Sequence, residues 1–69
     1  MAEIEVGNKT ILFSYKTPVA YYAPEVGYFV TKKHWSATTT RHINKWLRKY
    51  DTRGGICKVE QTELDAIVG

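Results

Sequence analysis

Residues 32–50, KKHWSATTTRHINKWLRKY, form the stretch that decides the fold. Hydroxyl oxygens of Ser36 and of the threonines at 38–40 can accept hydrogen bonds from the free amides at the start of a helix. The apolar side chains that follow recur at the spacing of one helical face, at Ile43, Trp46, Leu47 and Tyr50. The pattern therefore predicts one amphipathic helix over roughly residues 38–50.

The segment before this helix begins with the pattern of a β-hairpin. Residues 3–6 alternate polar and apolar side chains, residues 10–15 have the same strand character, and Gly7-Asn8 between them is typical of a tight turn. Proline has no amide hydrogen to donate, so we expect Thr17-Pro18 to interrupt the strand ladder.

A second hairpin is expected next. Residues 19–22 and 28–31 are rich in residues that favour strands, and the loop 23–27 between them contains a proline and a glycine. Side chains alternate between the two faces of a strand, so Tyr21 and Tyr22 should point to opposite faces of the sheet.

The C-terminal part predicts two short elements. Residues 51–55 contain two glycines able to end the helix in a positive-φ conformation, and residues 56–60 can return as a short strand. Thr62 is a plausible N-cap for a helical turn that docks Leu64 on the core. We therefore predict a single α+β domain over residues 1–69, in which a small antiparallel sheet of three to five strands packs against one main helix.

Size and composition limit the class of protein. A chain of 69 residues makes a small core, so we expect a homo-oligomer, although 43% apolar residues are enough for a globular fold. The single Cys57 cannot form an internal disulfide, which favours a reducing compartment. No segment looks like a secretion signal or a membrane span, so the chain is expected to be soluble and cytoplasmic, in a host cytoplasm if it is viral.

Charge is distributed unevenly along the chain. The net charge is +3, but basic residues concentrate in residues 32–50 and acidic residues prevail after them. Arg41, Lys45 and Lys49 are spaced by four, with Arg48 beside them, so they form one basic helix face. Such a face suits a phosphate-bearing partner, while the alternative is a solvated face with its cations toward the negative end of the helix dipole.

The predicted helix start is a second candidate site. Thr38, Thr39 and Thr40 place hydroxyls next to free amides where the helix dipole is positive, and Arg41 and His42 follow directly. This combination suits a phosphate, but it equally suits ordinary helix capping.

Other chemistry has little support. His34 and His42 have no carboxylate or thiol at ligand spacing, so we predict no metal site and no cofactor. Ser14, Ser36 and Cys57 lack a nucleophile motif, so we predict that the chain is not an enzyme.

The sequence interleaves five aromatic residues with three lysines: Tyr15, Tyr21, Tyr22, Tyr28 and Phe29 with Lys16, Lys32 and Lys33. This composition resembles the sheet platforms on which unpaired bases stack. Aromatic residues are also preferred in strands and supply the core of a small domain, so the packing interpretation stays open beside it.

A block with the pattern W-S-x-T-T-x-x-H-x-N occupies residues 35–44. Together with Val19-Ala20 and residues 28–31, it resembles short proteins of unknown function encoded by bacteriophages and related mobile elements. The resemblance runs over residues 17–48 and implies a viral or mobile-element origin. It marks four candidate site residues without implying an activity: Thr38, Thr39, His42 and Asn44.

These patterns favour a non-enzymatic protein that binds nucleic-acid phosphates. The predicted contacts are Lys32, Lys33, Arg41, Lys45, Arg48 and Lys49, with hydrogen bonds added by Thr38, Thr39 and His42. Two alternatives remain open, and both follow from what small viral proteins commonly do. In one, the chain inhibits a host defence protein by direct binding, and in the other it sequesters a small cyclic or linear nucleotide messenger.

Overall fold

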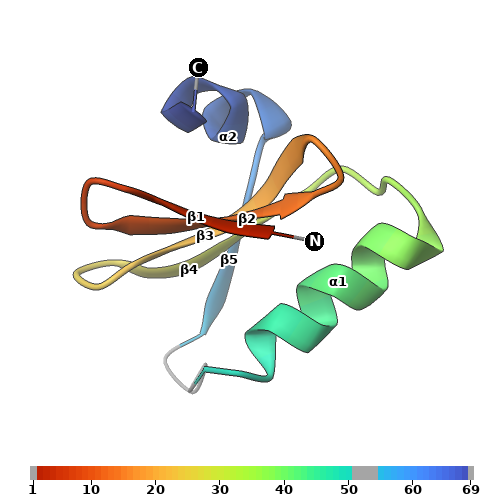
Figure 1. Cartoon of the computed structure of the whole chain (residues 1–69), viewed down its shortest axis with the longest axis horizontal. Helices are drawn as coiled ribbons and strands as arrows, with labels where there is room; N and C mark the ends of the chain where they lie inside the picture. The colour runs from red at the N-terminus through yellow and green to blue at the C-terminus, as the bar shows by residue number, and fades with distance from the viewer. Residues whose placement is uncertain (1, 51–54, 69) are drawn as a thin grey trace.

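Five strands form one sheet, which carries a helix on each face (Figure 1). The computed structural model describes residues 2–50 and 55–68. The elements are β1 (Ala2–Val6), β2 (Lys9–Ser14), β3 (Thr17–Ala23), β4 (Gly27–Thr31), α1 (Ala37–Leu47), β5 (Ile56–Val59) and α2 (Gln61–Val68). The α+β class, the two hairpins and the main helix are as predicted.

The strands follow one another across the sheet in chain order, β1 to β5. The first four strands pair antiparallel, as predicted, but β5 pairs parallel with β4, so the sheet is mixed. The reason is the length of the connection, because α1 carries the chain back along the sheet before β5 begins. In this parallel register Val30 of β4 lies opposite Lys58 of β5.

The predicted interruption at Pro18 is wrong. Pro18 is the second residue of β3 and lies opposite Phe13, next to a shift in register between Leu12 and Phe13. A bulge near the start of a strand tolerates proline, because the ladder there requires no amide donor. The chain reverses instead at Tyr15 and Lys16, where Tyr15 has a φ of 59°.

Helix α1 begins as predicted and ends earlier. The N-cap is Ser36, whose hydroxyl accepts a hydrogen bond of 3.1 Å from the amide of Thr39. The last residue is Leu47, and the amide of Arg48 donates to the Asn44 carbonyl at 3.2 Å. The predicted helix end at residues 51–55 lies almost entirely outside the described residues.

The C-terminal elements are close to their predicted positions. Strand β5 is present, and the predicted turn is a helix of eight residues, α2, which includes Thr62 within its first turn instead of at its cap. The Gln61 side chain anchors α2 to the sheet, because its amide donates to the Pro18 carbonyl at 2.7 Å and its oxygen accepts from Thr31 at 2.8 Å. In the described part of the chain, no helix has the length and apolarity required to span a membrane.

The two faces of the sheet have separate cores. Under α1, Trp46 is fully buried on Leu12, Ala20 and Val30. A ring of aromatic side chains surrounds it, formed by Tyr22, Tyr28 and Tyr50. On the α2 face, Tyr21 stacks on Phe29 with 4.6 Å between the ring centroids, so Tyr21 and Tyr22 point to opposite faces as predicted. Most of the aromatic residues therefore pack the domain.

Candidate functional site

A pocket of about 240 Å³ opens between α1 and the sheet edge formed by β4 and β5. Val30 and Ile43 supply apolar lining, and Lys58 lines the pocket from β5. Lys58 comes here because it lies opposite Val30 in the parallel register, and neighbours on adjacent strands share a face. We call this cavity the β4–α1 pocket.

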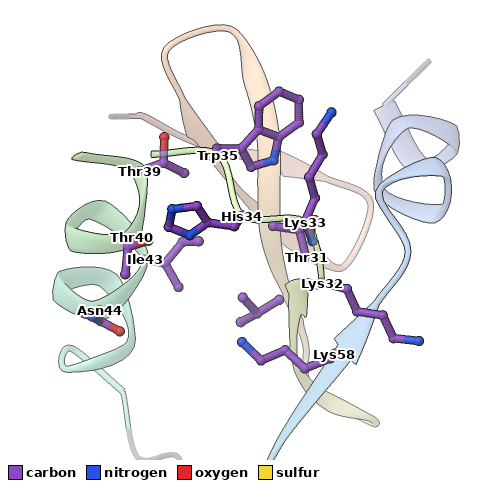
Figure 2. Close-up of a pocket in the computed structure, with 11 residues that line it drawn as sticks. Thr31, Lys32, Lys33, His34, Trp35, Thr39, Thr40, Ile43, Asn44 and Lys58 are labelled. Atoms are coloured by element: carbon purple, nitrogen blue, oxygen red, sulfur yellow. Dashed lines mark hydrogen bonds between the residues drawn. The ribbon is translucent and has the colours of Figure 1, made fainter. Parts of the chain in front are cut away.

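Figure 2 shows how the polar side chains of the pocket are directed. His34, in the segment after β4, and Lys58, on β5, extend toward α1, where Thr40 and Asn44 face them. The polar side chains that meet in the pocket thus come from three separate parts of the chain.

Two of the predicted phosphate contacts border this pocket without entering it. The Lys32 ammonium turns away to Glu60, 3.2 Å from its carboxylate oxygen. The Lys33 ammonium lies 4.0 Å from the centroid of the Trp35 ring, a cation–π contact. Trp35 is itself held in place, because its indole N–H donates to Gln61 at 3.2 Å.

A second hollow, of about 370 Å³ and more open, lies along α1. It is lined by Arg41, Asn44, Lys45 and Arg48, and we call it the basic hollow. Asn44 lines both the basic hollow and the β4–α1 pocket. The two depressions are therefore neighbours on one surface of the molecule.

Most of the cations that line the two depressions form no ion pair with a carboxylate within the described residues. The ion pairs there are Lys32 with Glu60 and Lys49 with Glu3, the latter at 3.5 Å. In residues 2–50 and 55–68, no salt bridge engages the four cations that line the depressions on the α1 side, Arg41, Lys45, Arg48 and Lys58. Lys49, although predicted as a contact, lines neither depression.

The predicted site residues Thr39 and His42 are engaged with the buried Ser14 of β2. The Ser14 hydroxyl is 3.0 Å from Thr39 Oγ1 and 2.9 Å from His42 Nδ1, and only 2% of Ser14 is exposed. Thr39 also accepts a hydrogen bond from the Ser36 hydroxyl at 3.3 Å. The predicted hydroxyl at Thr38 is exposed but lines neither depression.

A serine beside a histidine is the arrangement that activates a nucleophile, so this contact has a possible chemical meaning. The burial of Ser14 opposes it, because a substrate carbonyl has no access to a hydroxyl covered by Thr39 and His42. The contact instead joins β2 to α1. Sequence reasoning missed it because Ser14 and His42 are 28 residues apart.

Tyr15 lies beside this contact and is largely exposed. Its ring centroid is 5.9 Å from that of His42, and its φ of 59° is uncommon for a bulky residue. Of the tyrosines considered as a stacking platform, Tyr15 is thus the one that protrudes into solvent at the α1 surface.

Sequence reasoning missed Lys58 as a pocket residue, whereas Thr40, which lines the pocket, belongs to the predicted helix start. Lys58 belongs to the acidic C-terminal part, and no local pattern links it to α1. His34 and Asn44 stood out in the sequence, but only the fold brings them to one cavity. Within the described ranges, 2–50 and 55–68, no group of three or more His, Cys, Asp or Glu side chains could hold a metal ion.

Comparison with curated proteins and with solved structures finds no match to the chain. A family model does match, over residues 1–64, and its description is a family of unknown function, DUF8033. Because this match covers nearly the whole sequence, the chain belongs to the DUF8033 family.

Proposed function

We propose that the chain is a non-enzymatic binding protein that contacts nucleic-acid phosphates through the surface of α1. The observation that carries the proposal is the pair of adjoining depressions that share Asn44. Four of the cations that line them form no salt bridge within the described residues: Arg41, Lys45, Arg48 and Lys58. Cations gathered on one surface supply the electrostatic contacts that dominate nucleic-acid affinity.

The spacing of the cations on α1 fits a polyanion. Arg41, Lys45 and Arg48 line one hollow, and at about 1.5 Å of rise per residue they extend over about 10 Å of helix. A DNA strand carries one phosphate per roughly 3.4 Å of helix axis, so these three side chains cover a length comparable to about three phosphates. A single small anion would need fewer cations.

The partnered cations can still contribute. Lys32 and Lys49 hold exposed carboxylates, and exposed salt bridges are worth only about 0–1 kcal/mol. Both lysines can therefore exchange a carboxylate for a phosphate at little cost. Thr39 and His42 are different, because Thr39 Oγ1 and His42 Nδ1 already lie within hydrogen-bond distance of the buried Ser14 hydroxyl.

The proposal is tested by the salt dependence of binding. Fluorescence anisotropy with labelled single-stranded and duplex oligonucleotides should show binding at low salt that weakens steeply as salt rises. Replacing Arg41, Lys45 and Arg48 together by glutamine should reduce the slope of log Kobs against log salt by roughly 2 for a single strand. Absence of binding at low salt, or an affinity that does not change with salt concentration, would refute the proposal.

Lys9→Gln is the matched control for this experiment. Lys9 lies at the β1–β2 turn, pairs with Val6 and lines neither depression. The variant loses one positive charge, so a uniform effect of net charge would appear in it as well. Its slope should remain that of the unmodified protein.

The origin of the chain is part of the proposal. Residues 17–48 resemble short bacteriophage proteins, and this supports a viral or mobile-element origin. The genes that flank DUF8033 members test it. Members found mainly in chromosomal regions without phage genes would count against a viral origin.

A second candidate is direct binding to a host defence protein. It is favoured by β1, an edge strand whose Ile4 and Val6 are 48% and 42% exposed. An exposed edge can accept an extended segment of a partner as a further strand. Pull-down from host lysate after nuclease treatment separates the two candidates. A stoichiometric protein partner that binds the unmodified chain but not the Ile4→Lys variant supports binding to a host protein.

A further inference from the structure

We infer that the β4–α1 pocket takes one unpaired nucleobase of a bound strand, so that the protein prefers single-stranded to duplex nucleic acid. This inference rests on the proposed function, because the phosphates of the same strand lie on the surface of α1. It goes beyond that function by specifying single-stranded over duplex nucleic acid, a distinction that phosphate contacts alone do not make.

The shape of the pocket suits a base. Its volume of about 240 Å³ is below the roughly 300–1,000 Å³ of pockets for drug-sized ligands, so it holds one base and excludes a base pair. Val30 and Ile43 give it an apolar surface for the flat face of the base. The His34 ring extends toward α1 beside Ile43, and imidazole rings are among the groups on which unpaired bases stack (Figure 2).

The polar groups suit the edge of a base. Asn44 has an amide with both donors and an acceptor. The Thr40 hydroxyl donates to the Ser36 carbonyl at 3.0 Å and can still accept a hydrogen bond. These groups can pair with the edge that an unpaired base exposes. A bare phosphate would use only the donors and would leave the apolar surface without a function.

The surroundings of the pocket suit a single strand of nucleic acid. Lys58 reaches toward α1 from β5 and can contact the phosphate of the inserted nucleotide. Asn44 separates the pocket from the basic hollow, where Arg41 and Lys45 can contact the next phosphates. In a duplex the same base would first have to be unpaired and flipped out of its stack, so a single strand binds more readily.

The test compares three probes of about ten nucleotides each, a length typical for single-strand sites. They are an oligothymidylate, an abasic strand with the same number of phosphates, and a duplex of the same length. We expect the oligothymidylate to bind about tenfold more tightly than the abasic strand, the effect of one stacked base, and more tightly than the duplex.

Two variants locate the effect. His34→Ala removes the ring, and Thr40→Phe fills the pocket from an exposed helix position. In both variants the oligothymidylate and the abasic strand should bind with nearly equal affinity. The dependence of that affinity on salt should stay that of the unmodified protein. Ala37→Phe is the matched control, since Ala37 is exposed on the same helix and lines neither depression. Circular dichroism verifies that each variant is folded.

The outcomes separate the inference from the proposed function. Equal affinity for the oligothymidylate and the abasic strand, or for the oligothymidylate and the duplex, overturns the inference and leaves phosphate binding intact. A base preference that survives both His34→Ala and Thr40→Phe also overturns it, because the base then binds elsewhere. If no probe binds at low salt, both the inference and the proposed function are wrong.

Discussion

Ser14 is the residue that most directly links the sheet to α1. Its buried hydroxyl is within hydrogen-bond distance of Thr39 and His42. Ser14→Ala should lower the free energy of unfolding by about 1–2 kcal/mol, because two side chains lose a buried hydrogen-bond partner. Urea denaturation measures this. The control Thr38→Ala, at an exposed hydroxyl, should change stability by less than about 0.5 kcal/mol, and an equally small change in Ser14→Ala would contradict the assignment.

At the scale of an element, α1 depends on its N-cap. Its first turn contains no acidic residue and includes β-branched threonines, which are poor helix formers, so the hydrogen bond from the Thr39 amide to Ser36 matters more than usual. Ser36→Ala should cost about 1 kcal/mol, or roughly 4–8 °C in melting temperature. Ser36→Asp keeps an acceptor at the cap and should melt close to the unmodified protein. Equal melting of the alanine and aspartate variants would argue against the cap.

At the scale of the whole molecule, Tyr50 joins the end of the α1 region to β1. Burial raises the pKa of Tyr50, and the hydrogen bond that its hydroxyl donates to Glu3 at 3.2 Å and the charge of Glu3 raise it further. A folded-state pKa above the unfolded value stabilises the fold below about pH 10, and this stabilisation is lost as pH rises through the folded pKa. We therefore expect the free energy of unfolding to fall above about pH 10.

Glu3→Gln separates the charge of Glu3 from burial. It should lower the pKa of Tyr50 toward its ordinary value, as followed by tyrosinate absorbance with Tyr50→Phe to identify the signal. Burial also raises the pKa of Tyr21, on the other face of the sheet, and that signal should not respond. Glu5→Gln, on the same strand, is the charge control. An unchanged titration of Tyr50 in Glu3→Gln would contradict a contribution of the Glu3 charge to its pKa.

Much of the fold follows from local pattern. The helical spacing up to Trp46, the capping hydroxyl at Ser36 and the turn at Gly7-Asn8 each depend on residues a few positions apart, and each is found as predicted. Pro18 shows the limit of such reasoning, because the register of the neighbouring strand decides whether a proline interrupts a strand.

The sequence by itself determined the α+β class, the antiparallel hairpins, the amphipathic helix and the concentration of positive charge on it. Only the tertiary structure decided which of those side chains meet. The parallel pairing of β5 brings Lys58 to α1, and the packing of α1 on β2 commits Thr39 and His42 to Ser14. The physical reason is the distance along the chain between the residues that interact. Periodicity and capping arise between neighbours in the chain, whereas a pocket depends on contacts between distant segments, which local preferences do not encode.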